Sequence, residues 1–184
     1  MSPHQVLVPL LDGFEEIEAI TVIDVLRRAE IEVTSAGELA GPVRGAHEIY
    51  VTADAALADL EADQFKMVVL PGGMPGSANL AAHPKVQSLI KEIAAAGNYA
   101  CAICAAPIAL AAAGVHHGRR YTCYPTFDER IEGGTFVEDR VAIDGNLVTS
   151  RGPGTALDFA FALVKLLRDD DMSDTLRLQM LAGD

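Results

Sequence analysis

Cys104 is the side chain of this sequence that is best placed to act as a nucleophile. It directly follows a strand-like run at 99–103, and Ala105, Ala106 and Pro107 then open an alanine-rich helical segment. A thiol at a helix N-terminus faces unpaired N–H groups and the positive end of the helix dipole, and both lower the pKa of a cysteine. The alternative is a buried structural cysteine, but the sharp strand-to-helix turn favours a nucleophile elbow.

The other two cysteines are predicted to be core thiols. Cys101 and Cys104 have C-x-x-C spacing, but three residues of strand span about 10 Å, beyond the roughly 7 Å that a disulfide allows. Cys123 lies within another strand-like run. An odd number of cysteines without disulfide spacing indicates a reducing compartment, so we expect a cytoplasmic protein.

Glu18 is the second candidate for chemistry. It heads an apolar stripe on a predicted helix over 15–30. A carboxyl group that heads such a stripe near a ligand-binding edge should have a raised pKa through loss of solvation. The alternative is an acidic residue of the first helical turn that interacts with the helix dipole, which is our interpretation of Glu15 and Glu16.

The sequence contains no recognisable metal or nucleotide motif. None of the five histidines belongs to a cluster with metal-ligand spacing, although His47, in a predicted hairpin, could reach a site. The glycine-rich segments match neither the P-loop nor the dinucleotide-binding pattern. We therefore expect neither a metal nor another cofactor.

Length and charge restrict the class of protein. The 184 residues fit one domain, 1–184, and 50% of them are hydrophobic. The net charge of −12 argues against nucleic acid and anionic membranes as partners. The apolar run "VLVPLL" near the N-terminus is too short for a signal peptide or a membrane span.

Short apolar strands alternate with helices along the chain. Strands are predicted at 5–11, 31–36, 66–70, 99–103, 120–124 and 147–150, helices at 15–30, 84–96, 106–114 and 155–168, and hairpins at 41–52 and 136–149. This pattern indicates a flavodoxin-like three-layer α/β/α sandwich with a mostly parallel sheet and added β-hairpins.

The segments that follow the strands carry the candidate site. "DGFEE", "PGGMPG", "CAAP", "CYPTFDE" and "SRGPGT" each come after a predicted strand. In a parallel sheet these segments meet at the carboxyl edge, where ligands bind. Two of them contain paired glycines, which let backbone N–H groups approach a ligand closely.

These segments together resemble the DJ-one/ThiJ/PfpI superfamily. "EEIEA" at 15–19, "VVLPGG" at 68–73, "AICAAP" at 102–107 and "SRGPGT" at 150–155 occur in the family's order and cover essentially the whole chain. The resemblance is closest to the DJ-one branch and its bacterial YajL-type members. It implies a homodimer with a reactive cysteine.

The resemblance also implies roles for single residues. Cys104 would be the nucleophile, Glu18 the acid that shares a proton with it, and the N–H groups of Gly73 and Ala105 an oxyanion site. We expect the surrounding pocket to include Glu15, Arg28, His47, Gly72 and Tyr124.

Two positions depart from relatives. Animal members carry a histidine where this chain has Tyr124, which removes an expected general acid or base, whereas YajL-type members also have an aromatic residue there. Protease-like and amidotransferase-like relatives have a histidine after the cysteine, and Ala105 argues against their chemistry.

The resemblance favours a cofactor-independent glyoxalase of the third type, acting on 2-oxoaldehydes such as methylglyoxal. Deglycation of early glycated proteins would be a related view of the same chemistry. The alternative is an oxidative-stress sensor or redox-regulated chaperone in which Cys104 is oxidised to a sulfinate.

Overall fold

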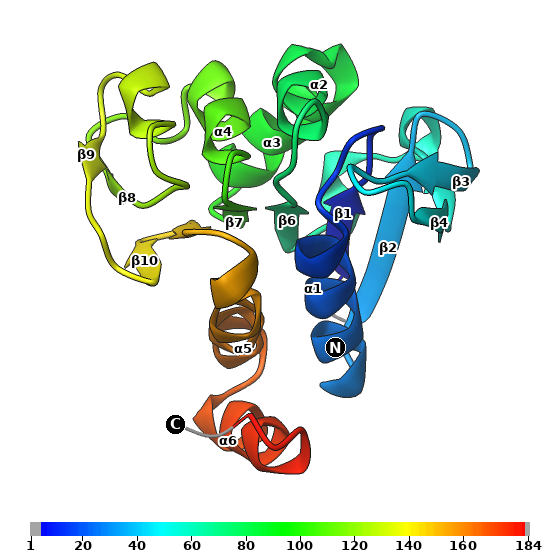
Figure 1. Cartoon of the computed structure of the whole chain (residues 1–184), viewed down its shortest axis with the longest axis vertical. Coiled ribbons are helices and arrows are strands. Elements are labelled where there is room, and N and C mark those ends of the chain that lie inside the picture. The colour runs from blue at the N-terminus through cyan, green and yellow to red at the C-terminus, as the bar shows by residue number, and fades with distance from the viewer. Residues whose placement is uncertain (1–4, 183–184) are drawn as a thin grey trace.

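A seven-stranded, mostly parallel sheet runs through the middle of the molecule (Figure 1). The structure is a computed structural model that describes residues 5–182. The strand order is β10-β11-β7-β6-β1-β2-β5. The bounds are β1 Gln5–Pro9, β2 Glu32–Gly37, β5 Ala55–Ala56, β6 Met67–Leu70, β7 Tyr99–Ile103, β10 Val141–Asp144 and β11 Leu147–Ser150. The predicted flavodoxin-like fold is confirmed.

Helices cover both faces of this sheet. They are α1 Glu16–Arg28, α2 Gly76–Ala82, α3 Pro84–Ala95, α4 Pro107–Ala113, α5 Ala156–Leu167 and α6 Asp170–Gln179. The first, fifth and sixth helices share one hydrophobic cluster, and the other three share a second. No helix among the described residues is long and apolar enough to cross a membrane.

The two clusters explain why the central strands β1, β6 and β7 are apolar at almost every position. Val6 and Val8 of β1 point into the cluster under α1 and α5, whereas Leu7 points into the cluster under α3 and α4. All three side chains are fully buried. Alternate strand residues face opposite sides of a sheet, so a strand covered on both sides has no solvent-facing position.

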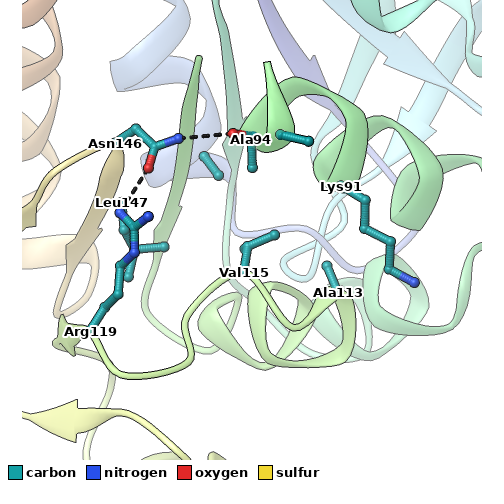
Figure 2. A pocket seen from close by; sticks show the side chains of 9 residues that line it. Lys91, Ala94, Ala113, Val115, Arg119, Asn146 and Leu147 are labelled. Carbon is teal, nitrogen blue, oxygen red and sulfur yellow. Dashed lines mark hydrogen bonds between the residues drawn. The ribbon is translucent and has the colours of Figure 1, made fainter. Parts of the chain in front are cut away.

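Two hairpins decorate the sheet, as the sequence predicts. Strands β3 Gly41–Arg44 and β4 Tyr50–Ala53 form an antiparallel pair. The second hairpin joins β10 to β11, and Asn146 in its turn ties it to α3 by donating to the carbonyl of Ala94 at 3.2 Å (Figure 2).

The predicted sheet strand at 120–124 is wrong. Only Arg120–Tyr121 is extended, as β8, and it pairs with β9 Thr135–Phe136 in a separate two-stranded sheet. Both edges of β11 are already occupied, by β10 and β7. The segment instead contacts the sheet through a side chain, because the Thr122 N–H donates to Thr149 Oγ1 at 2.8 Å.

Candidate active site

Cys104 lies at a strained turn between β7 and α4. Its φ of 64° is in the left-handed region, which a residue with a side chain adopts at a cost of roughly 1–2 kcal/mol. Its N–H donates to the carbonyl of Ser150 at 3.0 Å, and its carbonyl accepts from the N–H of Tyr124 at 2.8 Å. The predicted sharp strand-to-helix turn is therefore present, fixed by two neighbouring segments.

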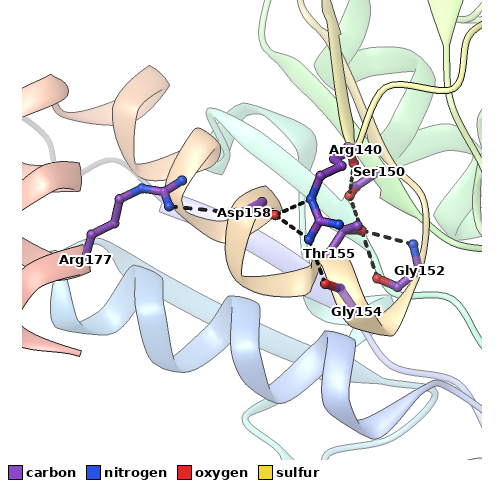
Figure 3. A network of polar contacts seen from close by, with 7 residues as sticks. All are labelled: Arg140, Ser150, Gly152, Gly154, Thr155, Asp158 and Arg177. Atoms are coloured by element: carbon purple, nitrogen blue, oxygen red, sulfur yellow. Dashed lines mark hydrogen bonds and ion pairs between the residues drawn. The ribbon is translucent and has the colours of Figure 1, made fainter. Parts of the chain in front are cut away.

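The segment at 150–155 supports this turn. Ser150 Oγ contacts Thr155 Oγ1 at 2.7 Å and donates to the carbonyl of Arg140, also at 2.7 Å (Figure 3). Thr155 Oγ1 also accepts from the N–H of Gly152 at 3.1 Å. These bonds hold Ser150 in place, and its carbonyl in turn anchors Cys104.

The carboxyl group of Glu18 reaches Cys104 from the first turn of α1. The side chain is fully buried, and Oε2 accepts from the N–H of Gly72 at 2.7 Å. The Cys104 thiol lies close enough to lower the pKa of this carboxyl group, and the buried Oε1 has no hydrogen-bond partner among the described residues. A Cβ on Gly72 would lie 2.6 Å from both Cys104 Cβ and Glu18 Oε2, so only glycine lets these two side chains meet.

Two backbone N–H groups act on the thiol of Cys104. They belong to Gly73 and Ala105, and their hydrogen bonds act to lower the pKa of the thiol. Gly73 has a φ of 86°, and a Cβ there would lie 2.5 Å from the backbone nitrogen of Glu15. The pKa of the thiol thus depends on two donors and one carboxyl group, and Cys104 is buried, with 9% of the residue exposed.

Burial sets the ionisation of the pair. It raises the pKa of Glu18 to about 7, as predicted. Burial and the charge of Glu18 also raise the pKa of Cys104 to about 12. The expectation of a lowered cysteine pKa is therefore wrong, because it considered the N–H groups but not the buried carboxylate. Between these values the pair carries one negative charge, with a base directly beside the thiol.

His47 sits at the outer side of this site. Its Nδ1 lies 2.9 Å from Glu16 Oε2 and 3.5 Å from Glu15 Oε2, and its side chain is 67% exposed. The hydrogen bond to Glu16 and the charges of both glutamates raise the pKa of His47. The ligand atoms of these three residues lie within 4.8 Å of one another, which is close enough to hold a metal ion. Glu16 Oε1 already accepts from the His47 N–H at 2.7 Å.

The structure brings together all but one of the predicted pocket residues. The Tyr124 ring is half exposed and lies beside Gly152, where a Cβ would be 3.2 Å from the ring. Arg28 is the exception: it is ten residues beyond Glu18 on α1, about 15 Å along the helix axis, and pairs with Asp24 at 2.8 Å. Arg28 therefore lies outside the pocket of its own chain.

Sequence reasoning missed the role of Ser150 and the contact between Glu16 and His47. Ser150 belongs to a segment that the sequence places at the carboxyl edge, but a backbone carbonyl has no sequence signal. The Glu16 contact joins residues 31 positions apart. No spacing rule within a single helix or strand could have found it.

We expect iodoacetamide to label Cys104 at a rate that rises with pH and levels off above a midpoint near 7. Below that pH both groups of the pair hold protons, and above it Glu18 can accept the thiol proton. Cys101 and Cys123 should stay unlabelled in the native protein because burial raises their pKa values and covers them fully. Peptide mass spectrometry over a pH series measures all three. Equal labelling would contradict an activated Cys104.

The fold and these contacts define an α/β protein whose elbow cysteine is paired with a buried carboxyl group. The family model described as "DJ-1/PfpI family" matches residues 4–166. This chain therefore belongs to the DJ-1/PfpI family.

Several members of this family are similar to this chain in sequence and in structure. Protein DJ-1 homolog B of Arabidopsis thaliana is 41% identical over 169 residues, which are 90% of this chain but only 39% of that protein. Glutathione-independent glyoxalase DJR-1.2 of Caenorhabditis elegans is 38% identical over 173 residues, 93% of this chain and 91% of that protein. The crystal structure of Drosophila melanogaster DJ-1beta has a TM-score of 0.95 at 38% identity, covering 99% of this chain and 100% of that one.

Proposed function

We propose that this protein is a cofactor-independent glyoxalase that converts 2-oxoaldehydes such as methylglyoxal into 2-hydroxy acids. The observation that carries the proposal is the contact of Cys104 with the Glu18 carboxyl group and with the N–H groups of Gly73 and Ala105. A relative that is named a glutathione-independent glyoxalase supports it.

The reaction begins with addition of Cys104 to the aldehyde carbon. Glu18 takes the thiol proton as the carbon–sulfur bond forms, and the carbonyl π electrons move onto oxygen. The N–H groups of Gly73 and Ala105 stabilise that oxyanion until Glu18 passes the thiol proton to it. The product is a hemithioacetal with a hydroxyl group, and Glu18 is again a carboxylate. Burial suits this step, because fixed donors are worth more where water is excluded.

Proton transfer and hydrolysis complete the cycle. Glu18 removes the proton from the former aldehyde carbon, and the hydroxyl proton of the hemithioacetal moves to the ketone oxygen of the resulting enediolate. Glu18 then returns its proton to the neighbouring carbon, which gives a thioester of a 2-hydroxy acid. Water then adds to the thioester carbonyl and the thiol leaves. For methylglyoxal the sum is one aldehyde plus one water giving one lactate, without a net redox change or a cofactor.

The test is conversion of methylglyoxal by the purified protein without glutathione. We expect lactate to appear in a one-to-one ratio with the aldehyde consumed, as measured by an enzymatic lactate assay. Consumption without lactate would instead indicate trapping of the aldehyde on side chains. Release of free amine from a glycated amino acid, without lactate from free methylglyoxal, would favour the deglycase reading.

The second candidate is a sensor in which Cys104 is oxidised to a sulfinate. The observation that favours it is the pair of backbone N–H groups beside the thiol, those of Gly73 and Ala105, since both could donate to sulfinate oxygens. Intact-mass spectrometry after mild peroxide would show a gain of two oxygen atoms on Cys104. A protein that is a sensor and not a glyoxalase would show this gain and would form no lactate from methylglyoxal.

We further propose that the protein is a homodimer through α1. The side chains of Ile17 and Ile20 are 57% and 44% exposed on the first turns of this helix, and Ile49, Tyr50 and Leu157 are large exposed apolar residues elsewhere. Residues three apart share one helix face, so the two isoleucines form an uncovered apolar strip.

Light scattering should give about twice the chain mass of 19.5 kDa at micromolar concentration. Ile20→Asp should shift the protein towards the monomer, because it would bury a carboxylate in an apolar contact. Glu30→Asp, at a distant exposed position beyond the helix, is the control. A monomer in the unmodified protein would reject the proposal.

A further inference from the structure

A small cavity at the edge of the sheet opposite Cys104 carries an unusual combination of groups. It has a volume of about 330 Å³, within the range of roughly 300–1,000 Å³ that is typical of ligand pockets. Ala100 and Leu147, which are paired at the start of β7 and β11, form its inner wall. Cys104 follows the other end of β7, about 13 Å further along the strand direction.

The cavity contains two cations in an acidic protein. Arg119 is half buried, and its Nη1 donates to the carbonyl of Asp144 at 2.9 Å and to Asn146 Oδ1 at 2.7 Å. Both acceptors are neutral. The carboxylate of Asp144 points elsewhere, since its Oδ2 accepts from the N–H of Arg120 at 2.8 Å.

Neither cation is neutralised by the protein itself. Within residues 5–182, Arg119 and Lys91 form no ion pair, although the chain has 26 acidic residues and only 14 basic ones. Figure 2 shows the two side chains on either side of the cavity, with Val115 and Ala113 between them. The Arg119 guanidinium keeps Nε and Nη2 free of hydrogen bonds to described residues, so donors remain for a ligand.

The remaining wall of the cavity is aliphatic. It consists of alanines together with Val115 and Leu147, and the full lining is Lys91, Ala94, Ala95, Ala100, Ala113, Val115, Arg119, Asn146 and Leu147. Asn146 is held by its own bonds to the carbonyls of Ala94 and Asn98, so the groups that orient Arg119 are fixed before any ligand arrives. A free anion without a carbon chain would leave this wall unused.

We propose that this cavity binds a small carboxylate with a short aliphatic chain. The carboxylate accepts charge-assisted hydrogen bonds from the free N–H groups of Arg119, and Lys91 adds a second positive charge at the rim. The chain covers the alanines, Val115 and Leu147. The site is separate from the Cys104 site, and its occupation does not depend on the proposed glyoxalase reaction.

The test is a titration of the full-length, ¹⁵N-labelled protein with sodium hexanoate, followed by NMR. We expect saturable shifts of the amide signals of Ala100, Val115 and Leu147, with a dissociation constant in the millimolar range or below. Hexanamide has the same shape without the charge and should bind at least about tenfold more weakly. Inorganic phosphate should bind more weakly too, because it lacks the aliphatic chain.

Variants distinguish the contribution of the two positive charges to hexanoate binding from that of the cavity shape. Arg119→Gln should weaken hexanoate binding at least about tenfold, and Lys91→Gln only about two- to fivefold because Lys91 is exposed. Ala95→Leu is a second variant, for the case that Arg119→Gln disturbs the turn that Arg119 supports. It keeps both cations and narrows the cavity from an exposed position on the helix, so it should abolish hexanoate binding.

Three results would overturn the proposal. One is the absence of saturable shifts at these signals, and another is equal binding of hexanoate and hexanamide. The third is equal or tighter binding of inorganic phosphate, which would show a plain anion site that does not select an aliphatic chain.

Discussion

Replacing Cys104 by serine should reduce lactate formation from methylglyoxal at least about 10³-fold. The hydroxyl group is a far weaker nucleophile than the thiol, and Glu18, with a pKa of about 7, is too weak a base to ionise it. The fold should persist, because serine has nearly the same shape and keeps the two backbone bonds, to Ser150 and Tyr124, that hold residue 104 at the turn. Steady-state kinetics and a thermal melt on one preparation measure both effects.

Cys101→Ala is the matched control for this prediction. Cys101 precedes Cys104 by three residues on β7 but is fully buried in the core. Its loss should lower stability by about 1 kcal/mol through lost packing, while turnover per folded molecule stays unchanged. A Cys104→Ser variant that still forms lactate at the normal rate would show that another group is the nucleophile.

The sequence predicted the parts of this site that depend on local order. Cys104 could be found because strand residues precede it and an alanine-rich helix follows, and Glu18 because it heads an apolar helical stripe. The central strands β6 and β7 were predictable because burial on both faces leaves them apolar at each position.

The errors concern contacts between distant segments. The segment at 120–124 has a strand-like composition, but both edges of the sheet strand β11, to which Thr122 is bonded, are occupied. Helix α6 was not predicted because it is polar: it is held by Asp169, which accepts from the Met172 N–H at 2.8 Å, and by packing against α5. The pKa of Cys104 moved opposite to expectation because burial and a carboxylate from α1 outweigh two N–H groups.

Replacing Glu18 by glutamine should remove proton transfer but keep the geometry of the Glu18–Cys104 pair and the oxidation of Cys104. We expect turnover of 2-oxoaldehydes to fall by roughly 10²–10⁴-fold, since the amide can hold the geometry but cannot accept the substrate proton. Its oxygen can still accept from the N–H of Gly72, and its NH₂ group can face the sulfur of Cys104. A lactate assay at several pH values measures the loss.

The cysteine should remain oxidisable in this variant. The charge of Glu18 and its hydrogen bond both raise the pKa of Cys104, so removing the carboxylate lowers that pKa from about 12, although burial still opposes ionisation. Peroxide should therefore still oxidise Cys104, as intact-mass spectrometry would show. Unchanged lactate formation in Glu18→Gln would rule out the proton-transfer role and leave the sensor as the better proposal.

The same substitution should stabilise the protein at pH 8. The pKa of Glu18 is about 7 in the folded state against an ordinary value of 4.5, so the folded state holds this proton more tightly than the unfolded state. Stability therefore falls as the pH rises from about 4.5 to 7, by about 3 kcal/mol for this group. Glutamine has no proton to lose, so denaturant titrations should show Glu18→Gln gaining stability over the wild type between pH 5 and pH 8. A parallel pH dependence in both proteins would contradict a buried, ionising Glu18.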